Sequence, residues 1–193
     1  MTSPPRPTPA SLEEVGTALP VLETARLVLR RMRERDADDV FAYASDPAVA
    51  EHTSWQPHAS VEESRAFAAR MARSAGCAWA IEHKGDRKVI GAIGYQPGIV
   101  PGVRGEIGFA LARPYWGQGL MTEAVREVIA FGFKVLGLNR IQARCKVENP
   151  ASARVMEKVG MTFEGVLRES SFSKGRFLDL KIYSILRREW RQR

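Results

Sequence analysis

Cysteine and histidine are scarce in this chain of 193 residues, which holds two cysteines and three histidines. Cys77 and Cys145 both lie in apolar stretches with a strand pattern, so we expect buried, reduced thiols rather than a disulfide framework. The three histidines, His52, His58 and His83, show none of the spacings with cysteine that are typical of a metal site. We therefore expect no metal, and the reduced thiols favour a cytoplasmic location.

Long apolar runs are also absent, and no stretch approaches the ~20 residues that a membrane-spanning helix needs. Four prolines fall within the first nine residues, where a secretory signal would have its apolar centre. Residues 1–18 are predicted to be a disordered, proline-rich tail, and residues 19–190 a single domain. We accordingly expect no membrane contact and no secretion.

Negative charge is in deficit, because 29 lysines and arginines outnumber 22 aspartates and glutamates, for a net charge of +7. A basic protein favours acidic partners, such as a nucleotide-containing cofactor, an RNA-rich particle or an acidic protein surface. The positive residues are scattered, and their two clusters, at 30–33 and 187–193, are predicted to be solvated ends. No zinc-finger, RNA-recognition or basic-zipper pattern occurs, so we expect no direct DNA binding.

Alternating strand and helix patterns predict a mixed α/β fold. The segments from 51 to 60 and from 96 to 105 are predicted to be loops. The strand Glu106 to Ala112 is apolar on both faces, which places it at the centre of the sheet. The expected order is one strand, two helices, three strands, a long helix, a strand, a short helix and two strands, at residues 22–30, 36–46, 60–73, 77–82, 88–95, 106–112, 118–135, 141–147, 149–160, 162–168 and 177–186.

A turn with two glycines, Gly117 and Gly119, separates the central strand from the longest helix. Glycine lets the backbone turn tightly and approach a ligand closely. The first turn of the helix offers unpaired N–H groups at the positive end of its dipole, which suits an anion such as a pyrophosphate. The third glycine of a dinucleotide fingerprint is missing, as is the Gly-Lys-Ser/Thr of a phosphate-binding P-loop. Taken alone, the turn is equally compatible with an ordinary strand-to-helix connection.

Three stretches in this order are similar to the GCN5-related N-acetyltransferase (GNAT) superfamily, in particular to its RimJ/RimL-type members. They are Leu22–Leu27, Tyr115–Ala124 and the stretch from Asn149 to Met161, and the resemblance covers about residues 20–188. It implies a central, mixed, mostly antiparallel twisted sheet of about six to seven strands, flanked by about four helices. It also implies transfer of an acetyl group from acetyl-CoA to a primary amine.

The resemblance implies that acetyl-CoA lies between the glycine turn and the central strand. Its pyrophosphate would meet the backbone N–H groups of the turn, and its pantetheine arm would run beside the strand, where this strand parts from the one at 141–147. Two positions depart from the broad family motif: Trp116, which is familiar in the RimJ/RimL subgroup, and Met121, whose bulk is expected to narrow the approach to the phosphates. The implied cofactor-binding residues are Phe109, Ala110, Leu111, Trp116, Gly117, Gln118, Gly119, Leu120, Met121, Asn149 and Ser152.

Acetyl transfer to an amine needs a path for the amine's proton, a donor to the developing oxyanion and an acid for the departing thiolate. Glu106 is the candidate base, directly or through water; a solvent-facing charge at the strand edge is the alternative. A backbone N–H near Ala110 or Leu111 is the expected oxyanion donor. In many relatives a tyrosine serves as the general acid, but this chain has Met156 at that position, which cannot donate a proton. The resemblance assigns that role to Ser152, with capping of the helix as the alternative.

Acceptor specificity is expected from two loops, at residues 52–58 and 169–177. Trp55 stands in the first loop and either lines the site or folds back on the core. Ser171 lies in the second, near the position of an acidic residue in RimL-type relatives, and Glu106 is also expected to meet the acceptor.

The expected acceptor is a protein N-terminal α-amine, possibly of a ribosomal protein, as in the family. Small amines such as an amino acid, a polyamine or an antibiotic are the first alternative, and a non-catalytic acyl-CoA-binding module is the second. A homodimer is left open.

Overall fold

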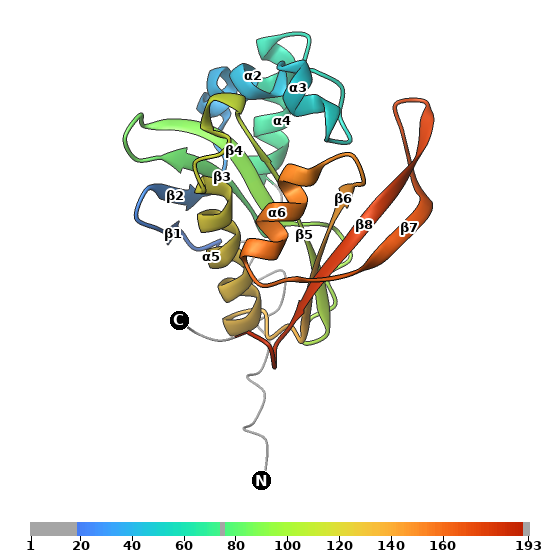
Figure 1. Ribbon diagram of the computed structural model, residues 1–193. Coiled ribbons are helices and arrows are strands. Elements are labelled where there is room, and N and C mark those ends of the chain that lie inside the picture. The colour runs from blue at the N-terminus through green and yellow to red at the C-terminus, as the bar shows by residue number, and fades with distance from the viewer. Residues whose placement is uncertain (1–18, 74–75, 191–193) are drawn as a thin grey trace.

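The computed structural model describes residues 19–73 and 76–190, which form one eight-stranded sheet with helices on both of its faces (Figure 1). The strand order is β1-β2-β3-β4-β5-β6-β8-β7, and all neighbours are antiparallel except β5 and β6. The strands are β1 Leu22–Glu23, β2 Leu27–Arg30, β3 Ala78–His83, β4 Lys88–Tyr95, β5 Arg104–Leu111, β6 Arg140–Lys146, β7 Thr162–Ser173 and β8 Arg176–Leu186.

Five α-helices and two short 3-10 helices occur within the described ranges. Helices α5 and α6 lie on the face of the sheet that is in front in Figure 1, while α2, α3 and α4 gather at its upper end. The helices are η1 Glu34–Asp36, α2 Ala37–Ala44, α3 Pro47–Glu51, α4 Val61–Arg73, η2 Arg113–Tyr115, α5 Leu120–Lys134 and α6 Pro150–Lys158.

Side chains of the central strands alternate between two buried clusters, because successive residues of a strand point to opposite faces. Ile107 and Ile141 pack with Val125 of α5 in the larger cluster. Ala80 on the opposite face packs with Val40 of α2 in the smaller one. The sheet is therefore covered on both sides at its centre, as the apolar sequence of β5 predicts.

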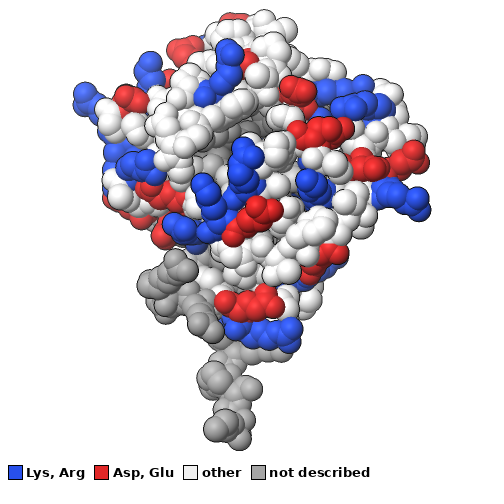
Figure 2. Space-filling model, in the orientation of Figure 1, with Lys and Arg blue, Asp and Glu red and all other residues white. Residues whose placement is uncertain are grey.

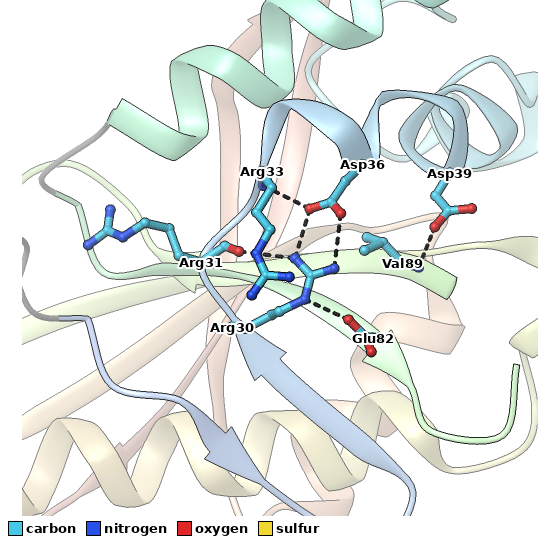
Figure 3. A network of polar contacts seen from close by, with 7 residues as sticks. All are labelled: Arg30, Arg31, Arg33, Asp36, Asp39, Glu82 and Val89. Carbon is cyan, nitrogen blue, oxygen red and sulfur yellow. Dashed lines mark hydrogen bonds and ion pairs between the residues drawn. The ribbon is translucent and has the colours of Figure 1, made fainter. Parts of the chain in front are cut away.

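A buried ion-pair network fixes α2 and η1 to the edge of the sheet (Figure 3). The Arg30 guanidinium at the end of β2 lies 2.8 Å from Asp36 and 2.6 Å from Glu82 of β3. Hydrogen bonding to Asp36 raises the pKa of Arg30, although burial opposes it. Asp39 of α2 accepts a hydrogen bond from the Val89 backbone N–H, 2.8 Å away. Removing Arg30 would leave the buried Asp36 carboxylate without its ion-pair partner, so the network helps to hold the helical layer in one position.

Several expected boundaries change in the structure. The sheet has eight strands rather than six to seven, because the stretch from Leu22 to Arg30 divides into β1 and β2. Five α-helices replace the expected four: α2 ends at Ala44, close to the expected end at 46, and Pro47 begins a further helix, α3, where the Asp46 side chain accepts from the Ala48 N–H. The expected loop after 168 is strand, since β7 and β8 continue to a turn at 174–175 as a ribbon that extends beyond the body (Figure 1).

Two further expectations concern the end of the long helix and the N-terminal tail. Val135, the last residue of the helix expected at 118–135, follows the end of α5 and is 41% exposed. The predicted tail at residues 1–18 lies outside the described residues.

Candidate active site

The glycine turn has the conformation that its sequence favours. Gly117 and Gly119 have φ angles of 75° and 78°, in the left-handed region that only glycine adopts without strain. Gly119 is the N-cap of α5, and no side chain caps this helix start. The backbone N–H groups of the first turn, beginning at Leu120, are therefore available to an anion.

Arg26, just before β2, holds the glycine turn from outside. Its guanidinium donates to the Gln118 carbonyl at 3.0 Å and to Glu123 Oε2 at 2.9 Å. Its backbone N–H donates to Glu123 Oε1 at 2.9 Å. The turn is thus tied both to the sheet and to the first turn of α5.

Backbone groups of β5 point alternately toward β4 and away from it. The Ala112 N–H donates to the Ile90 carbonyl, and the Gln96 N–H donates to the Glu106 carbonyl, each at 2.7 Å. Because the direction alternates along a strand, the even-numbered residues of β5 pair with β4 and the odd-numbered residues face β6. The Ala110 N–H therefore points toward β4. Of the backbone N–H groups near Ala110 and Leu111 that could donate to an oxyanion, those of odd-numbered residues such as Leu111 remain.

The gap between β5 and β6 opens after the pair Ile107 and Ala143, where their parallel pairing ends. The backbone groups of Phe109 and Leu111 point into this gap. The Leu111 carbonyl already accepts a hydrogen bond from Trp116 Nε1 at 2.7 Å. The remaining backbone groups of these two residues can pair with an extended ligand, as an additional strand would.

A cavity of about 390 Å³ follows the gap from the glycine turn to α3 and α6. Asn149 caps α6, because its side chain accepts from the Ser152 N–H at 3.0 Å. Ser152 is therefore not the cap of the helix, and it lines the cavity. The residues expected to bind the cofactor all line this cavity except Gln118: Phe109, Ala110, Leu111, Trp116, Gly117, Gly119, Leu120, Met121, Asn149 and Ser152.

Met121 is 6% exposed and packs within the larger buried cluster. Its side chain therefore packs mostly into the core beneath α5. Its backbone N–H remains in the first turn of the helix.

A second cavity, of about 550 Å³, adjoins the first and shares Phe109 and Ala110 with it. Trp55, one of the residues expected to meet the acceptor, lines this second cavity. The two cavities meet beside the part of β5 that does not pair with β6. A ligand in one cavity would therefore lie next to a ligand in the other.

Glu106 and Ser171 are not among the residues that line either cavity. The Glu106 carboxylate accepts from Gln142 Nε2 at 2.9 Å and from Arg144 Nε at 2.8 Å, both on β6. Its side chain lies on the same face of the sheet as Ala110. Because Glu106 does not line the second cavity, it can reach that cavity only through an intervening group. Ser171 sits within β7, opposite Leu178 of β8.

Among the lining residues that the sequence analysis did not name as site residues are His52 and Thr53, which lie in the first of its two acceptor loops, and Tyr43. His52 and Thr53 come from the segment after α3 and line the first cavity, and Tyr43 of α2 lines the second. His52 Nδ1 and the Tyr43 hydroxyl are buried without a hydrogen-bond partner in the described part of the chain. The only sequence signal for His52 and Thr53 was a proline, Pro47, followed by a polar loop. Tyr43 gave no signal, because it lies on the apolar side of an ordinary amphipathic helix.

Two lysines position the segment that carries these side chains. Lys146, at the end of β6, donates to the Glu51 carbonyl, and Lys174, at the tip of the β7–β8 ribbon, donates to the Ala50 carbonyl at 2.6 Å. Both carbonyls belong to the C-terminal end of α3, where cations are favoured. Burial, and to a smaller extent the charge of Lys146, lowers the pKa of Lys174. The loop between the cavities is therefore held from two directions.

Charge around the first cavity is positive, with Arg154 and Lys158 of α6 in its wall. Figure 2 shows the hollow on the face that carries α5 and α6, with lysine and arginine side chains beside it. Neither cavity has an aspartate or glutamate among its described lining residues. Across residues 19–73 and 76–190, no group of three potential metal ligands occurs and no helix is long and apolar enough to span a membrane.

Comparison with known proteins identifies the family. The profile of the acetyltransferase (GNAT) domain matches residues 26–162. The uncharacterized N-acetyltransferase YoaA of Bacillus subtilis is 34% identical over 172 residues, covering 87% of this chain and 97% of the relative. The crystal structure of a GNAT-family acetyltransferase from Bacillus anthracis matches with a TM-score of 0.80 and 28% identity, over 88% of this chain and 99% of that one.

The chain therefore belongs to the GNAT acetyltransferase family, and the expected fold class is confirmed. It is an acyltransferase of a family whose fold uses acetyl-CoA. Two relatives with named acceptors match shorter parts. The ribosomal-protein-serine acetyltransferase of Escherichia coli is 30% identical over 41% of this chain and 44% of its own. The spermidine N(1)-acetyltransferase of Vibrio cholerae is 30% identical over 46% of this chain and 51% of its own.

Proposed function

We propose that this protein transfers the acetyl group of acetyl-CoA to the α-amine of a protein N-terminus. The observation that carries the proposal is the meeting of two cavities at Phe109 and Ala110, beside a strand whose backbone groups lack a partner strand. One cavity ends at a helix start suited to phosphate, and the other has neutral walls suited to an uncharged acceptor.

The residues of the first cavity fit acetyl-CoA. The open space around Gly117 and the uncapped N–H groups that begin at Leu120 suit a pyrophosphate. Arg154 and Lys158 can neutralise further phosphate charge. The free backbone groups of Phe109 would hold the extended pantetheine arm, as an added strand is held. Acetyl-CoA would supply the activated acetyl group.

Residues of this chain can serve the remaining steps. The Leu111 N–H, or that of Phe109, would donate to the oxygen on which negative charge develops. The Ser152 hydroxyl would donate a proton to the departing sulfur, since its position in the first turn of α6 faces the cavity and the capping role belongs to Asn149. Asn149 would keep the helix start in place beside the cofactor.

The absence of a lining carboxylate in the described cavity walls favours an α-amine over a lysine side chain. An α-amine has a pKa of ~7.7–8.0 and a lysine ~10.4, so only the former is substantially neutral at physiological pH without a strong base. Two groups could take the remaining proton. Glu106 would act through water from its place beyond Gly108 on the same face of the sheet, and His52 would act through the buried Nδ1 that has no partner among the described residues.

A ribosomal protein is the leading acceptor within this proposal. The relative that acetylates a ribosomal-protein serine supports it, as does the net charge of +7, which favours association with an RNA-rich particle. The spermidine-acetylating relative supports a small amine instead. The neutral walls of the second cavity weigh against spermidine, because a polycation needs carboxylates to replace its hydration.

The test is thiol release from acetyl-CoA with a panel of amines. Peptides that begin with alanine, serine or methionine are compared with the same peptides blocked at the N-terminus, and with spermidine and free amino acids. Turnover that needs a free α-amine supports the proposal. Turnover with small amines alone would assign the first alternative, and acetyl-CoA binding without turnover would assign the non-catalytic module.

A further inference from the structure

We infer that the second cavity selects acceptors whose first residue has an uncharged, apolar side chain, and that Tyr43 and Trp55 recognise a carbonyl beside the amine. The inference rests on the proposed function and deepens it, since it names the class of N-terminus that the site takes. Tyr43 becomes a specificity-determining residue that nothing in the sequence marks.

The floor of the cavity is made of small residues in two rows across three strands. One row aligns Ala78, Gly94 and Gly108, and the next aligns Ala80, Ala92 and Ala110. Every residue of both rows except Ala80 lines the cavity. The short side chains of Ala92 and Ala110 line this space between the sheet and α2, whereas Ala78 occupies the place of a side chain at Gly94 and the flexible end of Gln96 occupies that at Gly108. The shape of the floor therefore depends on the sequence of these strands.

The described walls of the cavity carry no charged side chain. Aromatic and apolar groups form much of them, including Phe67 and Met71 of α4, Pro97 and Ile99. A charged group transferred from water into such surroundings loses hydration that no oppositely charged side chain of the described walls replaces. An apolar side chain instead gains from leaving water. The cavity therefore discriminates against acceptors with lysine, arginine, aspartate or glutamate at the first position.

Two polar groups of lining residues stand out because the rest of the described structure leaves them unused. The Tyr43 hydroxyl and Trp55 Nε1 are both buried, and neither has a hydrogen-bond partner in the ranges 19–73 and 76–190. Tyr43 is only 2% exposed, and burial raises the pKa of its hydroxyl, so it stays a neutral donor. Buried polar groups nearly always find a partner. Both groups can donate to a carbonyl oxygen, which every peptide carries next to its α-amine.

Tyr43 and Trp55 come from different elements that are fixed independently. Tyr43 belongs to α2, which the Arg30 network attaches to the sheet. Trp55 follows α3, and its backbone carbonyl accepts from the Thr53 hydroxyl at 3.3 Å. Two donors on separate lining residues would orient a carbonyl while the adjacent side chain fills the cavity.

The first experiment measures kcat/KM for peptides that differ only in their first residue. We expect leucine, methionine and phenylalanine to exceed lysine and aspartate by at least about tenfold. Equal rates for charged and apolar first residues would overturn the inference while leaving α-amine acetylation intact. Turnover of spermidine without any peptide turnover would overturn both proposals.

The second experiment removes one donor at a time. Tyr43→Phe should raise KM for a leucine-first peptide about tenfold, with kcat and the affinity for acetyl-CoA unchanged. It should leave Tm equal or higher, because the lost hydroxyl has no partner in the described structure. Tyr183→Phe is the matched control: its hydroxyl donates to Glu157 at 3.1 Å and its ring lies outside both cavities, so Tm should fall and KM should not change.

The third experiment fills the floor. Gly108→Val is compatible with a strand, and the group nearest to the added side chain is the flexible end of Gln96. The variant should lose leucine- and phenylalanine-first peptides by at least about tenfold and retain glycine- and alanine-first ones. An unchanged KM in Tyr43→Phe together with an unchanged size preference in Gly108→Val would contradict the inference.

Discussion

Arg26 and Glu123 join the beginning of the sheet to the beginning of α5. The Arg26 guanidinium lies 2.8 Å from Glu123 Oε2, and its backbone N–H lies 2.9 Å from Oε1. Burial disfavours the charged form of Glu123, but hydrogen bonds from Thr24 and Arg26 outweigh it and lower its pKa. A carboxylate in the first turn also complements the helix dipole. This pair explains why the stretch from Leu22 to Leu27 occurs together with the glycine turn.

Removing the Arg26 side chain should weaken the binding of acetyl-CoA indirectly, through the position of the glycine turn. Arg26→Ala frees the Gln118 carbonyl and loosens the turn, so we expect the Kd for acetyl-CoA to rise about tenfold by isothermal titration calorimetry. Arg73→Ala, which removes another exposed arginine that pairs with Glu34, is the control of equal charge. Equal affinities in both variants would contradict a positioning role for Arg26.

Gly117 is predicted to serve both the turn and the ligand. Gly117→Ala forces a left-handed conformation on alanine, at a cost of about 1–2 kcal/mol in the free energy of unfolding. The added methyl also obstructs close approach of a phosphate. Gly175→Ala, at a φ of 79° in the turn of the β7–β8 ribbon, carries the same strain far from the cavity. We expect both variants to lose similar stability in denaturant unfolding and only Gly117→Ala to lose affinity for acetyl-CoA.

Ser152 is predicted to act on the leaving thiolate rather than on the helix. Because Asn149 caps α6 and accepts from the Ser152 backbone, Ser152→Ala leaves the cap intact. We expect kcat to fall ~100-fold with Tm unchanged, as is usual for a positioned acid. Ser170→Ala, on β7, should change neither quantity. A fall in kcat of less than about tenfold would remove Ser152 from the catalytic step.

The acid stability of the protein should depend on Glu164. Hydrogen bonding to Arg140, and then to Ser184, lowers the pKa of Glu164 from 4.5 to about 2. A carboxyl whose pKa is depressed in the folded state contributes stability above its ordinary pKa, which is lost as the pH falls toward 2. Solvent screening reduces the effect, because the Glu164 side chain is 37% exposed.

In thermal unfolding between pH 7 and pH 2.5, the wild-type Tm should therefore fall more steeply below pH 4.5 than that of Glu164→Gln. Glu148→Gln, at a more exposed carboxylate that lies 3.9 Å from Arg176, is the control. Parallel curves for wild type and Glu164→Gln would show that the ion pair with Arg140 contributes nothing to stability.

Local patterns in the sequence were sufficient to predict the glycine turn and the start of a helix at Asn149. Both depend on residues close together in the chain: a left-handed glycine before a helix, and an asparagine before proline. The central position of β5 also followed from its apolar character on both faces.

The second cavity could not be predicted in the same way. Its floor depends on the register of three strands, which aligns Gly94 with Gly108 across the sheet. Tyr43 meets it only because the Arg30 network sets the position of α2. The placement of Glu106 was likewise decided by pairing with β6, whose side chains at Gln142 and Arg144 engage the carboxylate.

The most direct test of the account is a crystal structure of the protein with acetyl-CoA. We expect the pyrophosphate oxygens within hydrogen-bond distance of backbone N–H groups between Gly117 and Met121, and the thioester beside Phe109 and Leu111. Phosphates bound elsewhere, or a pantetheine arm that makes no backbone contact with β5, would contradict it.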